Sequence, residues 1–154
     1  MIKNHKESIQ IPMVGFGTYL INNEETEKYI LSAFLAGYRH IDTAEAYGNE
    51  EGVGLAIKNA RSELGLSREE IFVTTKLWPG NESWGQPPKT YESTLESLKA
   101  SLDKLKLEYI DLYLIHAPFS KDNRLEQWGA LCELRKMGKA KSIGVCNYNK
   151  SHIE

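Results

Sequence analysis

Four polar residues with complementary chemistry lie at the ends of three apolar runs in the sequence. Asp42 and Tyr47 follow one run, Lys76 lies at the end of the next, and His116 ends a third. Each run is expected to be a strand that a helix follows. In a parallel barrel of such units, residues just past the strand ends point at one face, where active sites are built. An acid, a phenol, an amine and an imidazole are therefore expected to meet.

This combination suits the reduction of a carbonyl group. Hydride addition develops negative charge on the carbonyl oxygen, which calls for a proton donor there in the transition state. The phenol of Tyr47 is the expected donor, and because a free phenol has a pKa of about 10, a neighbouring cation must favour the phenolate. Lys76 is placed for that role, and Asp42 would hold it charged and oriented. His116 either orients the substrate carbonyl from a neutral ring or shares the proton transfer, two roles that the sequence does not separate.

Each of the four residues also has a purely structural interpretation. Asp42 fits a turn or cap residue, and Lys76 fits a side chain that extends its stem over the mouth of a barrel. Tyr47 fits a half-buried packing ring, and His116 fits a strand-end histidine with satisfied hydrogen bonds. These interpretations are favoured for each residue alone, whereas the ordered set of four favours the catalytic one.

Short apolar runs alternate with helical stripes along the chain, a pattern typical of β/α units with a parallel sheet. Strands are expected over residues 13–17, 38–42, 71–77, 109–116 and 140–146. Helices are expected over residues 24–36, 49–64, 95–105 and 124–137, and Ser67 with Glu70 resembles a capping box that introduces a short turn. The residues expected on buried helix faces are Tyr29, Ile30, Ala33, Phe34, Val53, Ala56, Ile57, Ala60, Leu64, Leu95, Leu98, Leu102, Leu105, Leu125, Trp128, Leu131 and Cys132.

Composition narrows the class of protein. The 154 residues are 41% hydrophobic, and 19 basic against 21 acidic residues give a net charge of −2, which argues against a nucleic-acid or membrane-surface partner. The two cysteines, Cys132 and Cys146, lack the spacing of a metal site or a redox pair. No metal is therefore expected. Residues 1–10 are polar and no run is long enough to span a membrane, so a cytoplasmic location is expected.

Five blocks of the sequence resemble the aldo-keto reductase family in their order and approximate spacing. They are residues 15–19 (GFGTY), 37–44 (GYRHIDTA) with 47–50 (YGNE), 74–78 (TTKLW), 111–118 (DLYLIHAP) and 143–148 (IGVCNY). The resemblance implies an α/β fold, the (β/α)8 TIM barrel, and NADPH-dependent reduction of aldehydes or ketones to alcohols. It also implies that the four polar residues are the family's catalytic Asp, Tyr, Lys and His.

The resemblance covers only the first five of the eight β/α units. A complete barrel of this kind needs about 250 residues, so residues 1–154 are expected to form a single domain that is the amino-terminal part of the barrel. In this family the segments after the fifth strand hold the adenosine phosphate of the cofactor. Weak or absent turnover is therefore expected for the 154 residues alone.

By resemblance, residues 17–19 lie against the dinucleotide, where glycine permits a close backbone approach; a tight strand exit is the structural alternative. Cys146 and Asn147 align with the family's Ser-Asn pair that contacts the nicotinamide amide, and a thiol donates a weaker hydrogen bond than a hydroxyl. Asn147 also fits a polar strand terminus. The cofactor-binding set that the resemblance implies is Gly17, Thr18, Tyr19, Asp42, Cys146 and Asn147.

Aromatic side chains are the expected walls of the substrate pocket. By resemblance Tyr19 and Trp78 line it, together with Tyr47 and His116. Ala117 occupies a position where the family often has tryptophan, and it is expected to widen one side of the pocket. The alternative is that the small residue reflects local packing.

Two functions stay open. The first is the NADPH-dependent carbonyl reductase. The second is a catalytically inactive or split barrel fragment that acts only by association with a partner chain. Five strands without closure would leave the first and fifth with open edges, which favours self-association or a complementing chain.

Overall fold

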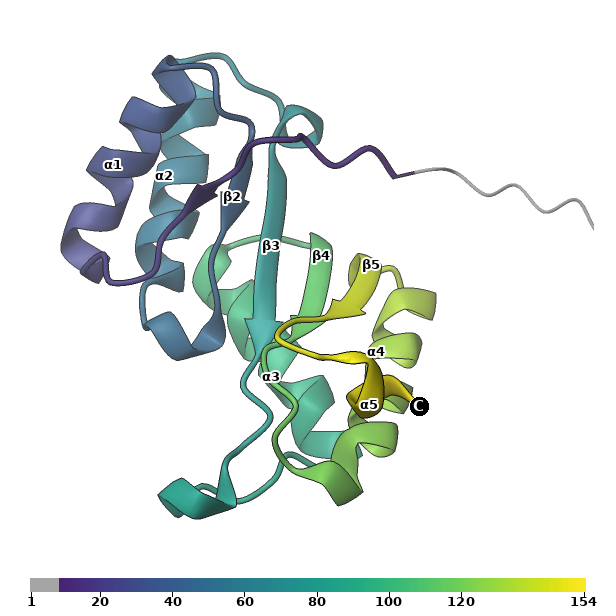
Figure 1. Cartoon of the computed structure of the whole chain (residues 1–154). Coiled ribbons are helices and arrows are strands. Elements are labelled where there is room, and N and C mark those ends of the chain that lie inside the picture. The colour runs from purple at the N-terminus through teal and green to yellow at the C-terminus, as the bar shows by residue number, and fades with distance from the viewer. Residues whose placement is uncertain (1–8) are drawn as a thin grey trace, which may run out of the picture.

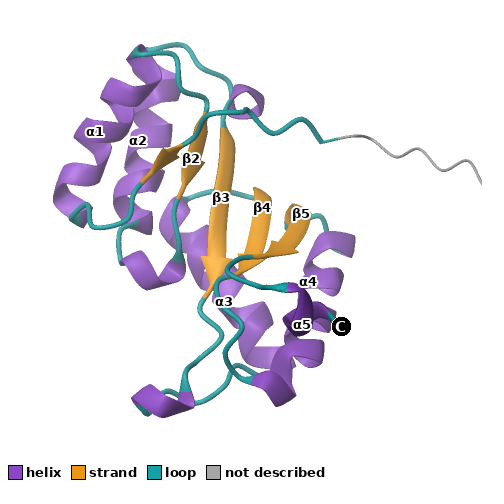
Figure 2. Cartoon of the chain, viewed as in Figure 1, coloured by secondary structure: helices purple, strands orange, loops and turns teal. Residues whose placement is uncertain are grey.

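A computed structural model describes residues 9–154, and most of the polar amino-terminal stretch considered above, residues 1–8, lies outside the described residues. Five strands form one parallel sheet in chain order, β1-β2-β3-β4-β5 (Figures 1 and 2). The strands are β1 (Phe16–Gly17), β2 (His40–Asp42), β3 (Phe72–Leu77), β4 (Ile110–Ile115) and β5 (Ala140–Val145). Every connection is therefore a crossover, as parallel pairing requires.

The crossovers are helices that pack side by side on the outer face of the curved sheet (Figure 2). They are α1 (Asn23–Leu35), α2 (Glu50–Glu63), α3 (Tyr91–Leu105) and α4 (Arg124–Lys136), and a short α5 (Lys150–Ile153) follows β5. Consecutive helices contact one another, α1 with α2, α2 with α3, and α3 with α4. This arrangement leaves one end of the sheet to the loops that follow the strands.

The core lies between the sheet and these helices, and β3 at its centre is buried at all six positions. Apolar side chains from both layers fill it, as expected for parallel strands covered by helices. The core residues are Ile30, Phe34, Ile41, Val53, Ala56, Ile57, Ala60, Leu66, Ile71, Val73, Leu77, Leu98, Leu102, Leu105, Ile110, Tyr113, Ile115, Leu131, Leu134 and Ala140.

The predicted order of strands and helices is confirmed, with differences at the boundaries. β1 holds two residues where five were expected, because Met13 and Val14 are exposed and pair with no neighbour in the sheet. The predicted capping box is confirmed, since the Ser67 backbone N–H donates to Glu70 Oε2 over 2.8 Å. It introduces a 3₁₀ turn, Arg68–Glu70.

The predicted buried face of α4 was wrong by part of a turn. Leu125 is 86% exposed and Trp128 is 37% exposed, whereas Gln127, Ala130 and Leu134 are buried beside Leu131. Gln127 takes the inner position because its amide donates to the carbonyl oxygens of Pro79 and Lys89, over 3.1 and 3.0 Å.

Tyr29 was also expected inside and is 41% exposed, whereas the expected Ile30, Ala33 and Phe34 are buried together with Thr26. Across residues 9–154, no helix is both long enough and apolar enough to cross a membrane.

Candidate active site

Strand register brings the predicted catalytic residues to the same end of the sheet. Asp42 is the last residue of β2, and it pairs with Thr74 of β3, two positions before Lys76. Lys76 pairs with Leu114 of β4, and the His116 backbone N–H extends that ladder by donating to the Leu77 carbonyl over 3.0 Å. The three strands therefore end together, as the sequence predicted.

The ammonium of Lys76 is the centre of the site. Its Nζ donates to Asp42 Oδ1 over 2.5 Å, to the Thr43 carbonyl over 2.9 Å and to the Tyr47 hydroxyl over 3.4 Å. These three acceptors match the three N–H donors of an ammonium. Lys76 is only 4% exposed, while the Asp42 side chain remains 35% exposed. A nearly buried cation is thus held against the phenol by one carboxylate.

His116 packs against the ring of Tyr47. Its ring meets the Tyr47 ring edge-on with centroids 5.5 Å apart, and it meets Trp78 in the same way at 5.8 Å. Burial of the ring lowers the pKa of His116 below its ordinary value of 6.5, and the Lys76 ammonium lowers it further against the opposing effect of Asp42. The imidazole is therefore neutral at neutral pH, and its buried Nδ1 has no hydrogen-bond partner among the described residues.

Tyr47 stands on a 3₁₀ turn, Glu45–Tyr47, which Gly48 closes with a φ of 68°. We call this segment the Tyr47 turn. The Glu45 carboxylate ties it to the end of β3, because Oε2 accepts from the Trp78 backbone N–H over 3.0 Å and Oε1 from Lys89 Nζ over 3.0 Å. The sequence reasoning missed Glu45 and Thr43 as site residues. Their partners lie more than thirty positions away, so neither local pattern nor periodicity could reveal them.

The segment after β1 was expected to bind a dinucleotide. A Cβ at Gly17 would meet no other atom within 4 Å, so this glycine faces open space. Thr18 is fully buried, and its hydroxyl shares its one hydrogen between two acceptors inside the protein, the Asp42 carbonyl at 3.3 Å and Asn49 Oδ1 at 3.2 Å. Tyr19 is 65% exposed and packs its ring 5.1 Å from that of Tyr47. Tyr19 is thus brought to the site, whereas the side chain of Thr18 points away from it.

Cys146 and Asn147 follow β5 at the same end of the sheet. The Cys146 backbone N–H donates to the Ile115 carbonyl over 2.8 Å, and Asn147 Nδ2 donates to the His116 carbonyl over 2.8 Å. Nδ2 also lies 3.4 Å from the Cys146 sulfur. Both side chains therefore lie beside the backbone of the predicted catalytic histidine.

Left-handed backbone conformations gather around these strand ends. Leu20 after β1, Ser120 after β4 and Asn147 after β5 have φ values of 63°, 54° and 61°. Such conformations cost a non-glycine residue free energy, and they concentrate where function fixes the backbone. The loops that follow three of the strands are therefore conformationally constrained around the site.

Aromatic side chains gather beside His116, and Trp78, the expected wall of the substrate pocket, is among them. The Trp78 ring stacks on Trp84 at 5.8 Å, and Phe119 contacts both indoles at 5.7 and 5.9 Å. Trp78 is fixed further by donating from Nε1 to Gln86 Oε1 over 2.7 Å. Ala117 is 7% exposed. The sequence reasoning did not find Trp84, which ends a short 3₁₀ turn (Glu82–Trp84), or Phe119, which lies in the loop after β4, because neither segment has a periodic pattern.

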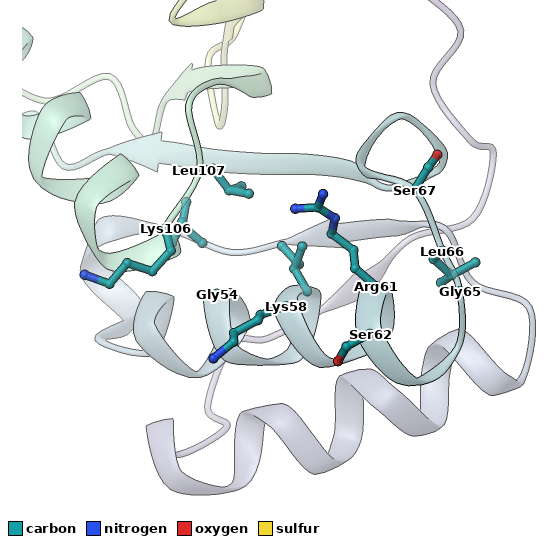
Figure 3. A pocket seen from close by; sticks show the side chains of 11 residues that line it. Gly54, Lys58, Arg61, Ser62, Gly65, Leu66, Ser67, Lys106 and Leu107 are labelled. Carbon is teal, nitrogen blue, oxygen red and sulfur yellow. The ribbon is translucent and has the colours of Figure 1, made fainter.

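A pocket of about 580 Å³ lies at the other end of the sheet (Figure 3). It is lined by α2 and by the segments that precede β3 and β4, and Lys58, Arg61 and Lys106 surround it. None of the four predicted catalytic residues lines it. In barrels of β/α units this end contributes to stability and the opposite end to chemistry, so the strand-end cluster is the candidate active site.

Comparison with known proteins identifies the family of this chain. The family profile described as "Aldo/keto reductase family" matches residues 13–154. Methylglyoxal reductase DkgA of Escherichia coli K12 is 48% identical over 145 residues, which are 94% of this chain and 48% of the relative. Glyoxal reductase of Bacillus subtilis 168 is 44% identical over 154 residues, covering 99% of this chain and 51% of the relative.

The fold agrees as well. The crystal structure of a Bombyx mori aldo-keto reductase in complex with NADP superposes with a TM-score of 0.81 at 39% identity, covering 93% of this chain and 49% of that one. The chain thus spans about half the length of the relatives it matches. The predicted fold class is confirmed: five consecutive β/α units of an aldo-keto reductase barrel. The chain belongs to the aldo/keto reductase family.

Proposed function

We propose that this chain carries the catalytic groups of an NADPH-dependent reductase that converts aldehydes or ketones to alcohols. The observation that carries the proposal is the contact of one nearly buried ammonium, Lys76, with both the Asp42 carboxylate and the Tyr47 hydroxyl. Two relatives named as reductases of methylglyoxal and glyoxal, and a neighbour solved with NADP, support the same chemistry.

The strand-end residues fit such a cofactor. Open space in front of Gly17 leaves room for a planar ring to approach the backbone. The exposed amide of Asn147 and the neighbouring thiol of Cys146 are hydrogen-bonding groups suited to a carboxamide such as that of nicotinamide. When bound, NADPH supplies the hydride that adds to the carbonyl carbon.

In this proposal Tyr47 donates its hydroxyl proton to the carbonyl oxygen as the C–H bond forms, which yields the alcohol. The remaining phenolate is stabilised by the Lys76 ammonium, whose nitrogen lies 3.4 Å from the phenol oxygen. At an effective dielectric constant of about 20 this attraction is on the order of 5 kcal/mol, and the Asp42 carboxylate offsets part of it. His116, held neutral by burial and by Lys76, donates a hydrogen bond that orients the carbonyl.

The decisive experiment compares Tyr47→Phe with the unsubstituted protein in a longer chain that completes the barrel, because weak or absent turnover is expected for the 154 residues alone. Methylglyoxal and glyoxal are the first substrates to test, and NADPH oxidation is followed by absorbance. Loss of the proton donor is expected to lower kcat by at least about 10²-fold, while NADPH binding, followed by nicotinamide fluorescence, is retained.

Tyr29→Phe on the exposed face of α1 is the matched control, and it is expected to keep full turnover. Turnover by Tyr47→Phe equal to that of the unsubstituted protein would contradict the mechanism.

A second candidate function, association with a partner chain that continues the barrel, is favoured by the surface beside β5. An apolar groove of about 440 Å³ lies there, lined by Ile115, Leu125, Trp128, Val145, Tyr148 and Ile153 among others. Leu125 and Ile153 are 86% and 72% exposed. Within the described residues, β1 and β5 each have one strand neighbour.

Sedimentation of the chain over a range of concentrations tests this association. A dimer or larger species that Leu125→Glu dissociates is the expected result. Glu126→Gln, on the same turn of α4, is the control and should leave the mass unchanged. A monomer at every concentration would exclude self-association of the chain through this groove.

A further inference from the structure

The side chain of Asn49 lies fully buried, two residues after Tyr47. Its Oδ1 accepts from the hydroxyls of Thr18 and Thr43 over 3.2 and 2.9 Å. Its Nδ2 donates to the carbonyl oxygens of Thr18 and Ile21 over 2.8 and 2.9 Å. An amide side chain has two donor hydrogens and two acceptor lone pairs, so every hydrogen-bonding position of Asn49 is used.

These four bonds do not serve the helix that Asn49 begins. Asparagine is a favoured residue at the amino-terminal cap, where its side-chain oxygen accepts from the first turn. Asn49 occupies that position of α2, yet its side chain makes no capping bond. The amide is directed instead to the segments that follow β1 and β2.

The segments that Asn49 joins are those that contact the reacting groups. The carbonyl of Thr43 accepts from Lys76 Nζ over 2.9 Å. Tyr19, next to Thr18, packs against the ring of Tyr47. Asn49 itself continues the chain from the Tyr47 turn through Gly48. The buried amide of Asn49 therefore connects the segment that packs against the Tyr47 ring with the segment that accepts from the Lys76 ammonium.

We propose that Asn49 is a positioning residue that fixes the Tyr47 hydroxyl relative to the Lys76 ammonium. The role rests on the proposed reductase function and deepens it. Asn49 touches neither the phenol nor the ammonium, and it acts through the backbone of residues 18–21 and 43. Misplacement of a reacting group by about 1 Å costs on the order of 10²-fold in rate, so loss of the amide should reduce kcat by that order while NADPH binding stays intact.

Two substitutions of graded severity test the proposal. Asn49→Ala removes all four bonds, whereas Thr43→Val removes only the bond from the Thr43 hydroxyl and keeps the carbonyl that Lys76 uses. Asn59→Ala is the matched control on the same helix, because its amide donates to Glu27 on α1 and to no residue of the strand-end site. We expect kcat to fall strongly for Asn49→Ala, moderately for Thr43→Val and not at all for Asn59→Ala.

A double-mutant cycle separates positioning from general destabilisation. If Asn49 acts through the phenol–ammonium pair, Asn49→Ala should reduce kcat much less when Lys76 is already methionine. A fold-change in kcat that is the same in both backgrounds would overturn the proposal.

A second readout does not depend on turnover. In protein labelled with 13C-tyrosine, the resonance missing from Tyr47→Phe identifies Tyr47. That resonance should move in Asn49→Ala and Thr43→Val and stay in Asn59→Ala. If a longer chain that completes the barrel reduces no aldehyde, the reductase function fails while the resonance still decides the positioning. An unmoved Tyr47 resonance in folded Asn49→Ala would overturn the positioning role. If Asn49→Ala does not fold, an unmoved resonance in Thr43→Val would overturn it.

Discussion

Replacement of Asp111 by alanine should remove a large share of the stability of the sheet that carries the site. Asp111 Oδ2 accepts from Arg68 Nη2 over 2.7 Å and from the Val73 backbone N–H over 2.9 Å. Lys141 Nζ lies 3.6 Å from Oδ1. The side chains of Asp111 and Arg68 are each 9% exposed. One carboxylate on β4 thus joins β3, β5 and the turn before β3 at the end of the sheet opposite the active site.

The expected loss follows from these contacts. Removing one partner of a buried ion pair costs about 3–5 kcal/mol, because the other charge stays buried without compensation. The orphaned Val73 N–H adds about 1–3 kcal/mol. Arg68 keeps its bonds to the carbonyls of Ile71 and Tyr109, which reduces the first cost. We therefore expect Asp111→Ala to lower the free energy of unfolding by about 4 kcal/mol, out of the roughly 5–15 kcal/mol typical of a domain.

Urea unfolding followed by circular dichroism measures this loss. Glu133→Gln is the control, because the Glu133–Lys136 pair on α4 is exposed and its removal should cost less than about 0.5 kcal/mol. Asp111→Asn, which keeps an oxygen acceptor for the Val73 N–H, should lie between the two. A loss below about 1 kcal/mol for Asp111→Ala would refute the reasoning that the change leaves the buried charge of Arg68 without compensation.

Three further substitutions have expected effects on stability, each measured by urea unfolding. Tyr113→Phe should raise stability by about 1 kcal/mol, because the buried hydroxyl lacks a partner among the described residues; a loss of stability would mean that it has one. Burial raises the pKa of Glu50 above 4.5, so stability falls as pH rises from that value through the folded pKa. Glu50→Gln should abolish this fall, and an unchanged pH dependence would contradict it. Burial lowers the pKa of His40 below 6.5, so stability falls as pH drops from 6.5 through the folded pKa. His40→Gln should flatten that decline, and His152→Gln on α5 serves as the comparison.

The features that the sequence predicted well are those with local signals. Alternating apolar runs and stripes indicated the β/α order, and the Ser67–Glu70 box marked the turn before β3. The convergence of Asp42, Lys76 and His116 also followed, because it requires only that consecutive parallel strands end together.

What failed depends on contacts between distant segments. Gln127 displaced Leu125 from the inner face of α4 because two carbonyl groups, 48 and 38 positions away, needed donors. A hydrophobic stripe cannot reveal such a demand. Glu45 and Asn49 were missed as supports of Tyr47 for the same reason, since their partners become neighbours only after the strands align.

The sequential order of the strands bears on how the chain reaches its fold. Within residues 9–154, no strand is inserted between two that precede it in the sequence. During synthesis from the amino terminus, each strand after β1 can pair with a strand that has already been made, and this pairing displaces no other strand. Assembly can therefore advance one unit at a time, with a single helical crossover to close at each step. Lys76 and Asp42 would therefore meet once β3 has emerged, before β4, which precedes His116, has been translated.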